Sequence, residues 1–284
     1  MSIEFTKEDV IINKKDAIKS LNKLLEYYIN DSSGQHLKKA NLISYWLKDY
    51  VRFIDFEEKF DPSRNIAYKR GNIVKLNFGF NIGSEYGGLH YAIVLDNHNA
   101  HNSPVVTVIP LTSIKADKVP HKNSVELGNE IYRSLKIKYD TISKALEEEQ
   151  KEISEVLAMA DALYSLTQSA ITDTENSERG SEEFSKHLSD AKTYLNATKA
   201  LQNMWEEKKK HNEEEMAYLE KIGAEIAHMK EGSVALVNQI STISKIRIFD
   251  PRNLKGVLAG ISLSEESMEK INQKVKELYI FEQS

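Results

Sequence analysis

The sequence predicts an α+β fold in which a small antiparallel β domain is interrupted by a long helical hairpin. Proline is absent between Pro120 and Pro251, and five of the 12 glycines lie between Gly71 and Gly88. Short β-branched runs flank a long stretch rich in Glu, Lys, Ala and Leu. A stretch without helix breakers is typical of long helices, whereas short β-branched runs bounded by turn residues are typical of strands.

Two long helices are predicted over residues 139–173 and 182–229, separated by a polar segment around Gly180. Positions in the second helix alternate four- and three-residue spacings, which is the heptad spacing of a coiled coil. The predicted seam is Phe184, Leu188, Ala191, Leu195, Thr198, Gln202, Trp205, Lys209, Asn212, Met216, Leu219, Gly223 and Ile226. At about 1.5 Å per residue the second helix is roughly 70 Å long, so we expect the hairpin to project from a compact domain.

Strands are predicted at residues 72–78, 91–96, 104–111, 124–127, 233–238 and 245–249. Because the runs on either side of the hairpin need each other to make an adequate sheet, we expect one antiparallel barrel or strongly bent sheet. A final helix is predicted with Ser262 and Glu265 as a capping box. Its buried stripe is Met268, Ile271, Val275 and Leu278.

The N-terminal 60 residues are predicted to form two amphipathic helices with core-facing stripes. The first stripe is Ala17, Leu21, Leu24, Leu25 and Tyr28, and the second is Leu42, Trp46, Tyr50, Phe53 and Ile54. We therefore expect three parts: a helical extension over 1–66, a β domain over 67–132 plus 230–284, and an inserted hairpin over 133–229.

Composition excludes several classes of protein. The absence of cysteine excludes disulfide frameworks, thiolate metal sites and a cysteine nucleophile. No apolar run approaches the roughly 18 residues of a membrane span and no secretory signal pattern opens the chain, so we expect a soluble, cytoplasmic protein. The net charge is −5, but residues 133–230 hold 14 Lys and Arg against 20 Asp and Glu. The acidity therefore belongs to the hairpin and does not exclude a nucleic-acid partner.

The glycine-rich segment 69–97 is the candidate for chemistry. Its glycines let backbone approach a ligand closely, and a hydroxyl, a carboxylate and an imidazole stand beside them. The residues concerned are Gly83, Ser84, Glu85, Gly87, Gly88 and His90. A mobile hairpin turn is the alternative interpretation from composition alone. No Gly-Lys-Ser/Thr follows, so the segment is not a nucleotide P-loop.

Three motifs follow one another in this region: Arg70-Gly71-Asn72-Ile73-Val74, then Gly83-Ser84-Glu85-Tyr86-Gly87-Gly88, then Pro110-Leu111-Thr112-Ser113. A fourth is Asn238-Gln239-Ile240-Ser241-Thr242-Ile243-Ser244-Lys245. Together they resemble the MazF/PemK family of toxin endoribonucleases. The resemblance covers about 68–132 and 229–281, and leaves out the hairpin and the N-terminal helices.

This resemblance implies an SH3-like barrel of CcdB/PemK type, usually a homodimer, that cuts single-stranded RNA without metal or cofactor. The ribose 2′-OH attacks the adjacent phosphate and leaves a 2′,3′-cyclic phosphate and a 5′-OH. We expect the protein to act as a toxin or phage-defence effector. Its expected partners are RNA and an antitoxin or regulatory protein, with no membrane.

The expected catalytic residues are His90, Thr112 and Glu85. His90 stands where the family has an arginine, and Tyr91 follows where the family usually has a proline. Histidine exchanges protons near neutral pH, but it carries a less reliable positive charge than arginine. Either His90 is a general acid/base, with Thr112 positioning the phosphate and Glu85 as base or loop organiser, or activity is weakened or lost. The second alternative leaves a catalytically silent barrel that binds protein or RNA as a regulatory module.

Contacts with RNA are expected from Lys69, Arg70, Asn81, Ser84, Gly87, Gly88, Ser113, Gln239, Thr242 and Lys245. Ser241 and Ser244 replace an arginine and an aspartate of the family, so we expect a different sequence preference. No metal site is expected, because His98 and His101 have neither an added carboxylate nor a defined helix beside them.

Overall fold

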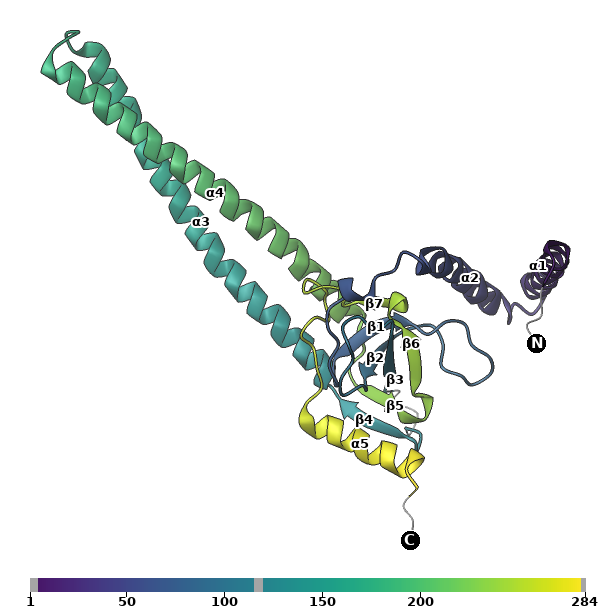
Figure 1. Cartoon of the computed structure of the whole chain (residues 1–284). Helices are drawn as coiled ribbons and strands as arrows, with labels where there is room; N and C mark the ends of the chain where they lie inside the picture. The colour runs from purple at the N-terminus through teal and green to yellow at the C-terminus, as the bar shows by residue number, and fades with distance from the viewer. Residues whose placement is uncertain (1–4, 115–119, 282–284) are drawn as a thin grey trace. The chain divides into compact units, whose positions relative to one another are not determined.

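A computed structural model describes residues 5–114 and 120–281 as two compact units. The first unit combines the residues up to Thr112 with residues 235–253 and those from 273 onward. The second combines residues 113–234 and 254–272. The three-part division expected from the sequence stays a prediction. The architecture is α+β, with an antiparallel sheet, a long helical hairpin, N-terminal helices and a C-terminal helix (Figure 1).

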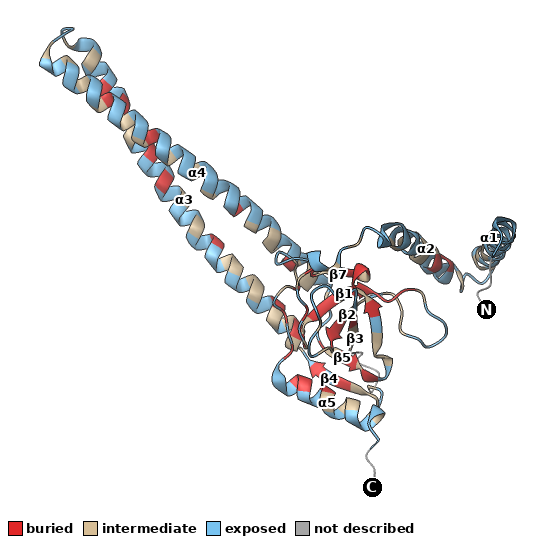
Figure 2. Cartoon of the chain, in the orientation of Figure 1, coloured by how far each residue is buried: buried red, intermediate tan, exposed pale blue. Residues whose placement is uncertain are grey.

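The sheet contains seven strands in the described residues, in the order β4-β5-β3-β2-β1-β7, with β6 also paired to β3. Their bounds are β1 Ile73–Asn77, β2 Leu89–Val94, β3 Val105–Ser113, β4 Ser124–Gly128, β5 Ser233–Leu236, β6 Ser241–Ser244 and β7 Ile248–Asp250. In register, Ile73 of β1 faces Ile93 of β2, which faces Ile109 of β3. The strands thus align their apolar residues, and β1, β2 and β3 hold many of the buried positions (Figure 2).

Short 3₁₀ helices interrupt the chain between strands: η1 Pro62–Arg64, η2 Val237–Gln239 and η3 Lys245–Arg247. The strand expected over 245–249 is therefore wrong in its first half. The Ile248 N–H donates to the Lys245 carbonyl oxygen and closes the turn, so that only residues from Ile248 onward pair with β1.

The N-terminal residues form α1, Lys7–Ile29, and α2, Leu37–Glu57, as expected. Helix α1 begins with a capping box, in which the Asp9 N–H donates to Thr6 Oγ1 (3.1 Å) and the Thr6 N–H donates to Asp9 Oδ2 (3.0 Å). The expected core-facing stripe of α1 is wrong, because none of its residues is buried. An amphipathic pattern indicates a face that favours contact, but only a neighbouring element buries that face.

Helix α2 packs against the sheet more closely than α1 does. Asn77 of β1 donates to Asp49 Oδ2 (2.9 Å), and the Phe53 ring lies edge-on to the Phe249 ring of β7 (6.5 Å between centroids). Only Ala40 and Ile43 of this helix are buried, and its other large side chains remain partly or largely exposed.

The second unit is dominated by the hairpin of α3, Glu130–Asn176, and α4, Glu182–His228. The two helices pair along their lengths, as the coiled-coil spacing predicted (Figure 1). The Phe184 N–H donates to Ser181 Oγ (3.0 Å), which caps the start of α4 after Gly180 adopts a positive φ of 93°.

One of the two predicted seam columns on α4 is displaced by one residue. Ala191, Thr198 and Asn212 are buried, as expected, but Leu188, Leu195, Gln202, Lys209 and Met216 are exposed. The residues one position earlier are less exposed, and Ile222 is wholly buried, although Met216 Sδ still lies 3.8 Å from Gln150 Nε2 of α3. Positions three and four residues away are both neighbours on a helix, so the partner helix decides between them.

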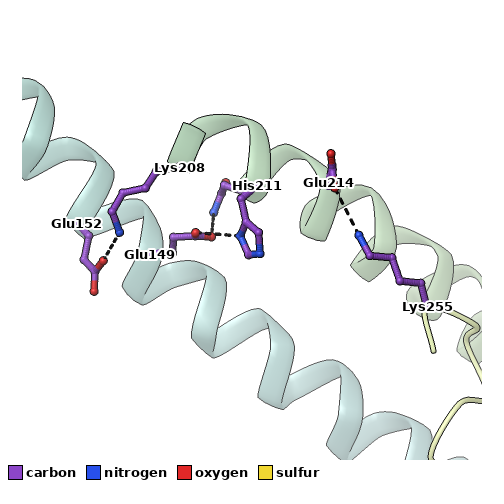
Figure 3. A network of polar contacts seen from close by, with 7 residues as sticks. Glu149, Glu152, Lys208, His211, Glu214 and Lys255 are labelled. Atoms are coloured by element: carbon purple, nitrogen blue, oxygen red, sulfur yellow. Dashed lines mark hydrogen bonds and ion pairs between the residues drawn. The ribbon is translucent and has the colours of Figure 1, made fainter. Parts of the chain in front are cut away.

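Polar contacts cross the middle of the hairpin (Figure 3). Lys208 Nζ lies 2.7 Å from Glu152 Oε2, and both His211 Nδ1 and Asn212 Nδ2 lie 3.0 Å from oxygens of Glu149. Lys208 therefore pairs across the hairpin with Glu152, whereas Lys209 pairs with Glu213 on its own helix (3.9 Å).

The base of the hairpin is bound to the segment before the C-terminal helix. Lys138 Nζ donates to the carbonyl oxygens of Val257 (2.9 Å) and Ala259 (2.8 Å), and Tyr218 Oη donates to Gly256 (3.0 Å). These are charge-assisted and neutral hydrogen bonds to backbone oxygens that no strand satisfies.

The C-terminal helix α5, Glu265–Tyr279, buries Met268 and Ile271. The expected capping box at Ser262 and Glu265 is wrong. The helix begins two residues later, and Ser264 Oγ accepts from the Ser267 N–H (3.3 Å). The Glu130 carboxylate of α3 accepts from the Ser264 N–H and from the Ser267 hydroxyl. A carboxylate that is distant in sequence therefore accepts the N-cap hydrogen bond that was expected to go to Glu265. Within residues 5–114 and 120–281, no helix is both long and apolar enough to cross a membrane.

Replacing Ile222 by alanine should lower the free energy of unfolding by about 2–5 kcal/mol, because a wholly buried side chain leaves a cavity. Urea unfolding followed by circular dichroism measures the loss. Ile171→Ala on α3 is the matched control, since Ile171 is 40 % exposed, and should cost less than about 1 kcal/mol. Equal losses in the two variants would contradict this description of the seam.

Candidate functional site

The glycine-rich loop between β1 and β2 is closed by backbone hydrogen bonds at its neck. The Phe78 N–H donates to the Gly88 carbonyl oxygen (2.8 Å), and the Gly88 N–H donates to the Gly79 carbonyl oxygen (2.7 Å). Gly79 and Gly88 both have a φ of +96°, and a Cβ on Gly87 would lie 2.7 Å from the Gly79 oxygen. These three positions therefore require glycine, for backbone conformation or for close approach.

Side chains within the loop fix its shape. Asn81 Nδ2 donates to the Tyr86 carbonyl oxygen (2.7 Å), and Glu85 Oε2 accepts from the Ile82 N–H (3.2 Å). The Glu85 carboxylate thus caps a turn of its own loop, which matches the organising role among the two expected for it.

Gln239, in η2, joins the loop to the far end of the chain. Its Oε1 accepts from the Tyr86 N–H (3.3 Å), and its Nε2 donates to the Ser84 carbonyl oxygen (3.4 Å). Ser241 Oγ in turn donates to the Gln239 carbonyl oxygen (3.0 Å). A segment more than 150 residues away therefore positions the loop.

Tyr86 of the loop contacts two expected site residues, His90 and Thr112. Its hydroxyl donates to the Leu111 carbonyl oxygen (2.5 Å) at the end of β3 and also contacts the Thr112 side chain. Its ring packs against the His90 ring at 4.6 Å between centroids and edge-on against Phe78 at 5.5 Å. His90 and Thr112 thus flank one tyrosine.

Burial sets the protonation states of this cluster. Desolvation lowers the pKa of the half-buried His90 below its usual value, opposed by a smaller effect of a hydrogen bond with the Gly87 backbone. Desolvation also raises the pKa of the Tyr86 phenol to about 12, and the Thr112 contact acts in the opposite direction. At neutral pH the site therefore offers a neutral imidazole and a protonated phenol.

Residues 69–169 match the family model described as PemK-like, MazF-like toxin of type II toxin-antitoxin system. The chain contains a PemK/MazF-like toxin domain. A search of curated proteins finds no match to this chain. The matched range runs from the glycine-rich loop into α3, and it does not extend to residues 229–281, where the resemblance rests on the motif at 238–245.

Several residues expected to contact RNA lie around the PemK/MazF-like loop. Asn81 and Ser84 are exposed within it, and Gly87 and Gly88 form its neck. Ser113 ends β3 beside Thr112 and is half-buried. These residues share one region with His90, and their contacts with RNA remain predictions.

Other expected contacts lie elsewhere or are engaged in the fold. Lys69 is exposed, whereas the Arg70 guanidinium donates to the Leu95 carbonyl oxygen. Thr242 is exposed on β6, where its Oγ1 lies 3.4 Å from Thr107 Oγ1. Thr107 and Thr242 are register partners of the β3–β6 pair, so this contact follows from the sheet.

Lys245 does not present its charge to the surface. Its side chain is 0 % exposed, and its Nζ donates to the carbonyl oxygens of Ala100 (3.0 Å) and His101 (3.2 Å). Burial lowers the pKa of this ammonium, while the Asp96 charge acts in the opposite direction. The expectation that Lys245 contacts RNA is therefore corrected, because its donors hold the loop before β3.

The histidines of the loop before β3 form no metal centre in the described structure. His101 Nε2 lies 2.5 Å from the Asn65 carbonyl oxygen. Residues 5–114 and 120–281 contain no cluster of three or more His, Cys, Asp or Glu suited to a metal ion.

Tyr86 is not among the residues expected to catalyse or to bind RNA, although it connects His90 with the end of β3. Its position inside the Gly-Ser-Glu-Tyr-Gly-Gly motif could have indicated a structural role, since the other residues of this motif are small or polar. Which groups it contacts depends on the end of β3, 25 residues away, and on β2.

Tyr86→Phe should lower the free energy of unfolding by about 0.5–1.5 kcal/mol, because it removes the hydroxyl that donates to Leu111 while keeping the ring. Chemical denaturation of the full chain measures the loss. Tyr45→Phe is the control, since Tyr45 is 61 % exposed on α2. A loss no larger than that of the control would contradict the role of the hydroxyl.

The His90 ring should titrate with a midpoint below 6.5 in the folded protein. The unfolded chain then binds the proton at higher pH than the folded chain, so this histidine makes the fold less stable as pH falls through 6.5 toward the folded pKa. Proton NMR of the histidine ring measures the midpoint, and His90→Gln identifies the signal. A midpoint at or above 6.5 would contradict the burial argument.

Proposed function

We propose that this chain is a metal-independent endoribonuclease that cuts single-stranded RNA and acts as a toxin or phage-defence effector. The match of residues 69–169 to a toxin family supports the class. The single observation that carries the mechanism is the placement of His90 and Thr112 on either side of Tyr86, beside a loop shaped by close glycine contacts.

In the proposed reaction the ribose 2′-oxygen attacks the adjacent phosphorus and the bond to the 5′-oxygen breaks. His90 in its neutral form accepts the 2′-OH proton, and the resulting imidazolium returns a proton to the departing 5′-oxygen. The lowered pKa of His90 favours the neutral form at neutral pH, as a general base requires. The products are a 2′,3′-cyclic phosphate and a 5′-OH.

The phosphorane formed on the way carries additional negative charge. The Thr112 hydroxyl supplies a hydrogen-bond donor at the end of β3, and exposed Lys69 supplies a cation for the RNA backbone. Glu85 organises the loop through the Ile82 N–H rather than exchanging protons. Ser113, Gln239 and Thr242 remain candidates for RNA contact.

Two further proposals concern the partners of the chain, the first supported by the family description and the second by the resemblance of its motifs. An antitoxin or regulatory protein restrains the nuclease, since the matched family belongs to type II toxin–antitoxin systems. The active form is a homodimer.

A catalytically silent barrel that binds protein or RNA is the second candidate. The observation that favours it is the burial of His90, because a neutral imidazole brings no fixed positive charge to a phosphorane.

Cleavage of a mixed-sequence RNA in the presence of EDTA separates the two candidates. Wild type should cut, and His90→Ala or Thr112→Ala should each reduce the rate by about 10²-fold or more, because a proton-transfer group or a charge-stabilising donor is lost. A 2′,3′-cyclic phosphate on the 5′ fragment, detected by mass spectrometry, identifies the reaction.

His98→Ala is the matched control, since it removes an exposed histidine from the loop before β3. Cleavage that persists unchanged in both site variants would overturn the assignment of His90 and Thr112. Absence of any cleavage by wild type would favour the silent barrel.

A further inference from the structure

A pocket of about 140 Å³ lies between α2 and η3, both in the first unit. Aromatic rings form much of its wall. Its lining residues are Trp46, Tyr50, Phe53, Ile54, Glu57, Ser244, Ile246 and Arg247. An apolar cavity of roughly 150 Å³ holds one six-membered aromatic ring, so this pocket has room for a single planar group.

Arg247 gives the pocket a polar group that the fold does not satisfy. Its guanidinium lies 5.0 Å from the Trp46 ring centroid, in cation–π contact. Among the described residues no group accepts a hydrogen bond from its Nε, which is buried. Because this Nε is inaccessible to solvent, an occupant of the pocket would meet the guanidinium at its outer Nη atoms, and an occupant with hydrogen-bond acceptors suits that charged group.

Two of the side chains that line the pocket also pack on the neck of the candidate catalytic loop. A Cβ on Gly79 would lie 2.7 Å from Arg247 Nη2 and 3.1 Å from the Trp46 ring, so both side chains pack directly on the Gly79 backbone. The Gly79 carbonyl oxygen is the one that accepts from the Gly88 N–H at the neck of the loop. The Gly79 N–H donates to Asn77 Oδ1 (2.9 Å). The Gly79 backbone therefore connects two side chains of the pocket with the neck of the loop.

We propose that Trp46, Tyr50 and Arg247 form a subsite that binds one nucleobase of the RNA, outside the nucleotides joined by the cut bond. This inference rests on the proposed RNA substrate. Bases stack on aromatic rings, and their edges carry carbonyl oxygens and ring nitrogens that accept hydrogen bonds from a guanidinium. α2 thereby becomes part of the substrate-binding surface.

A hydrophobic side chain from a partner protein is the competing occupant. It would contact the apolar wall, but it would bring no hydrogen-bond acceptor to the Arg247 guanidinium. A nucleobase offers both a planar ring for the aromatic wall and acceptors for the Arg247 guanidinium, so the described contacts favour RNA.

The test uses the full-length protein and a mixed-sequence single-stranded RNA with 2′-O-methyl riboses, which binds without being cut. Tyr50→Ala should weaken its binding by about 5- to 150-fold, the effect of losing one base–aromatic stack. Tyr50→Phe keeps the ring and should restore binding. Tyr45→Ala is the matched control on the same helix, because Tyr45 is 61 % exposed and does not line the pocket, whereas Tyr50 is 48 % exposed and does.

A second measurement locates the base directly. The same RNA carrying 4-thiouridine is photo-crosslinked, and mass spectrometry should find adducts within residues 46–57 of wild type that are lost in Tyr50→Ala.

Two outcomes would overturn the subsite: equal RNA affinities for wild type and Tyr50→Ala, or crosslinks confined to other segments. Unchanged RNA affinity in Tyr50→Ala together with weaker binding of a partner protein would assign the pocket to that protein instead. Cleavage of unmodified RNA is assayed in parallel. If wild type cleaves RNA but Tyr50→Ala binds it as tightly as wild type, the subsite alone is overturned. If Tyr50→Ala binds RNA more weakly but wild type cleaves none, the nuclease activity alone is overturned.

Discussion

The candidate site depends on one hydrogen bond, from the Tyr86 hydroxyl to the Leu111 carbonyl oxygen. It spans from the glycine-rich loop to the end of β3, and it holds the tyrosine ring against His90. Because burial keeps the phenol protonated up to a pKa of about 12, the hydroxyl remains a donor throughout the range in which a histidine titrates. The hydroxyl therefore donates to Leu111 whether the neighbouring imidazole is neutral or protonated.

Two further supports converge on the same loop from distant parts of the chain. Gln239 holds its outer edge through backbone groups, and the Gly79 backbone at its neck carries Trp46 and Arg247. The first support belongs to the segment that follows the hairpin, and the second includes a helix that precedes the matched domain. A segment after the hairpin and an N-terminal helix therefore both contribute to the geometry of the candidate site.

Local patterns predicted most of the secondary structure. The breaker-free heptads predicted the hairpin helices, and β-branched runs predicted most strands of the sheet, because helix and strand periods depend on the residue's own backbone and immediate neighbours. The site was predicted in part. The motifs indicated His90, Thr112 and Gln239 as a group, while Tyr86 was passed over, since its role depends on a carbonyl oxygen that lies 25 residues along the chain.

The sequence by itself thus determined the fold class, the presence of two long helices and the residue types near the loop, although α3 begins at Glu130 and not at the predicted residue 139. Only the tertiary structure decided which side chains are buried and which groups they contact. It placed Lys245 in the interior on two carbonyl oxygens, chose Lys208 over Lys209 as the residue facing α3, and replaced the expected cap at Ser262 by Ser264. The physical reason is common to all three: a polar group is stable where a partner in space satisfies it, and sequence spacing does not specify that partner.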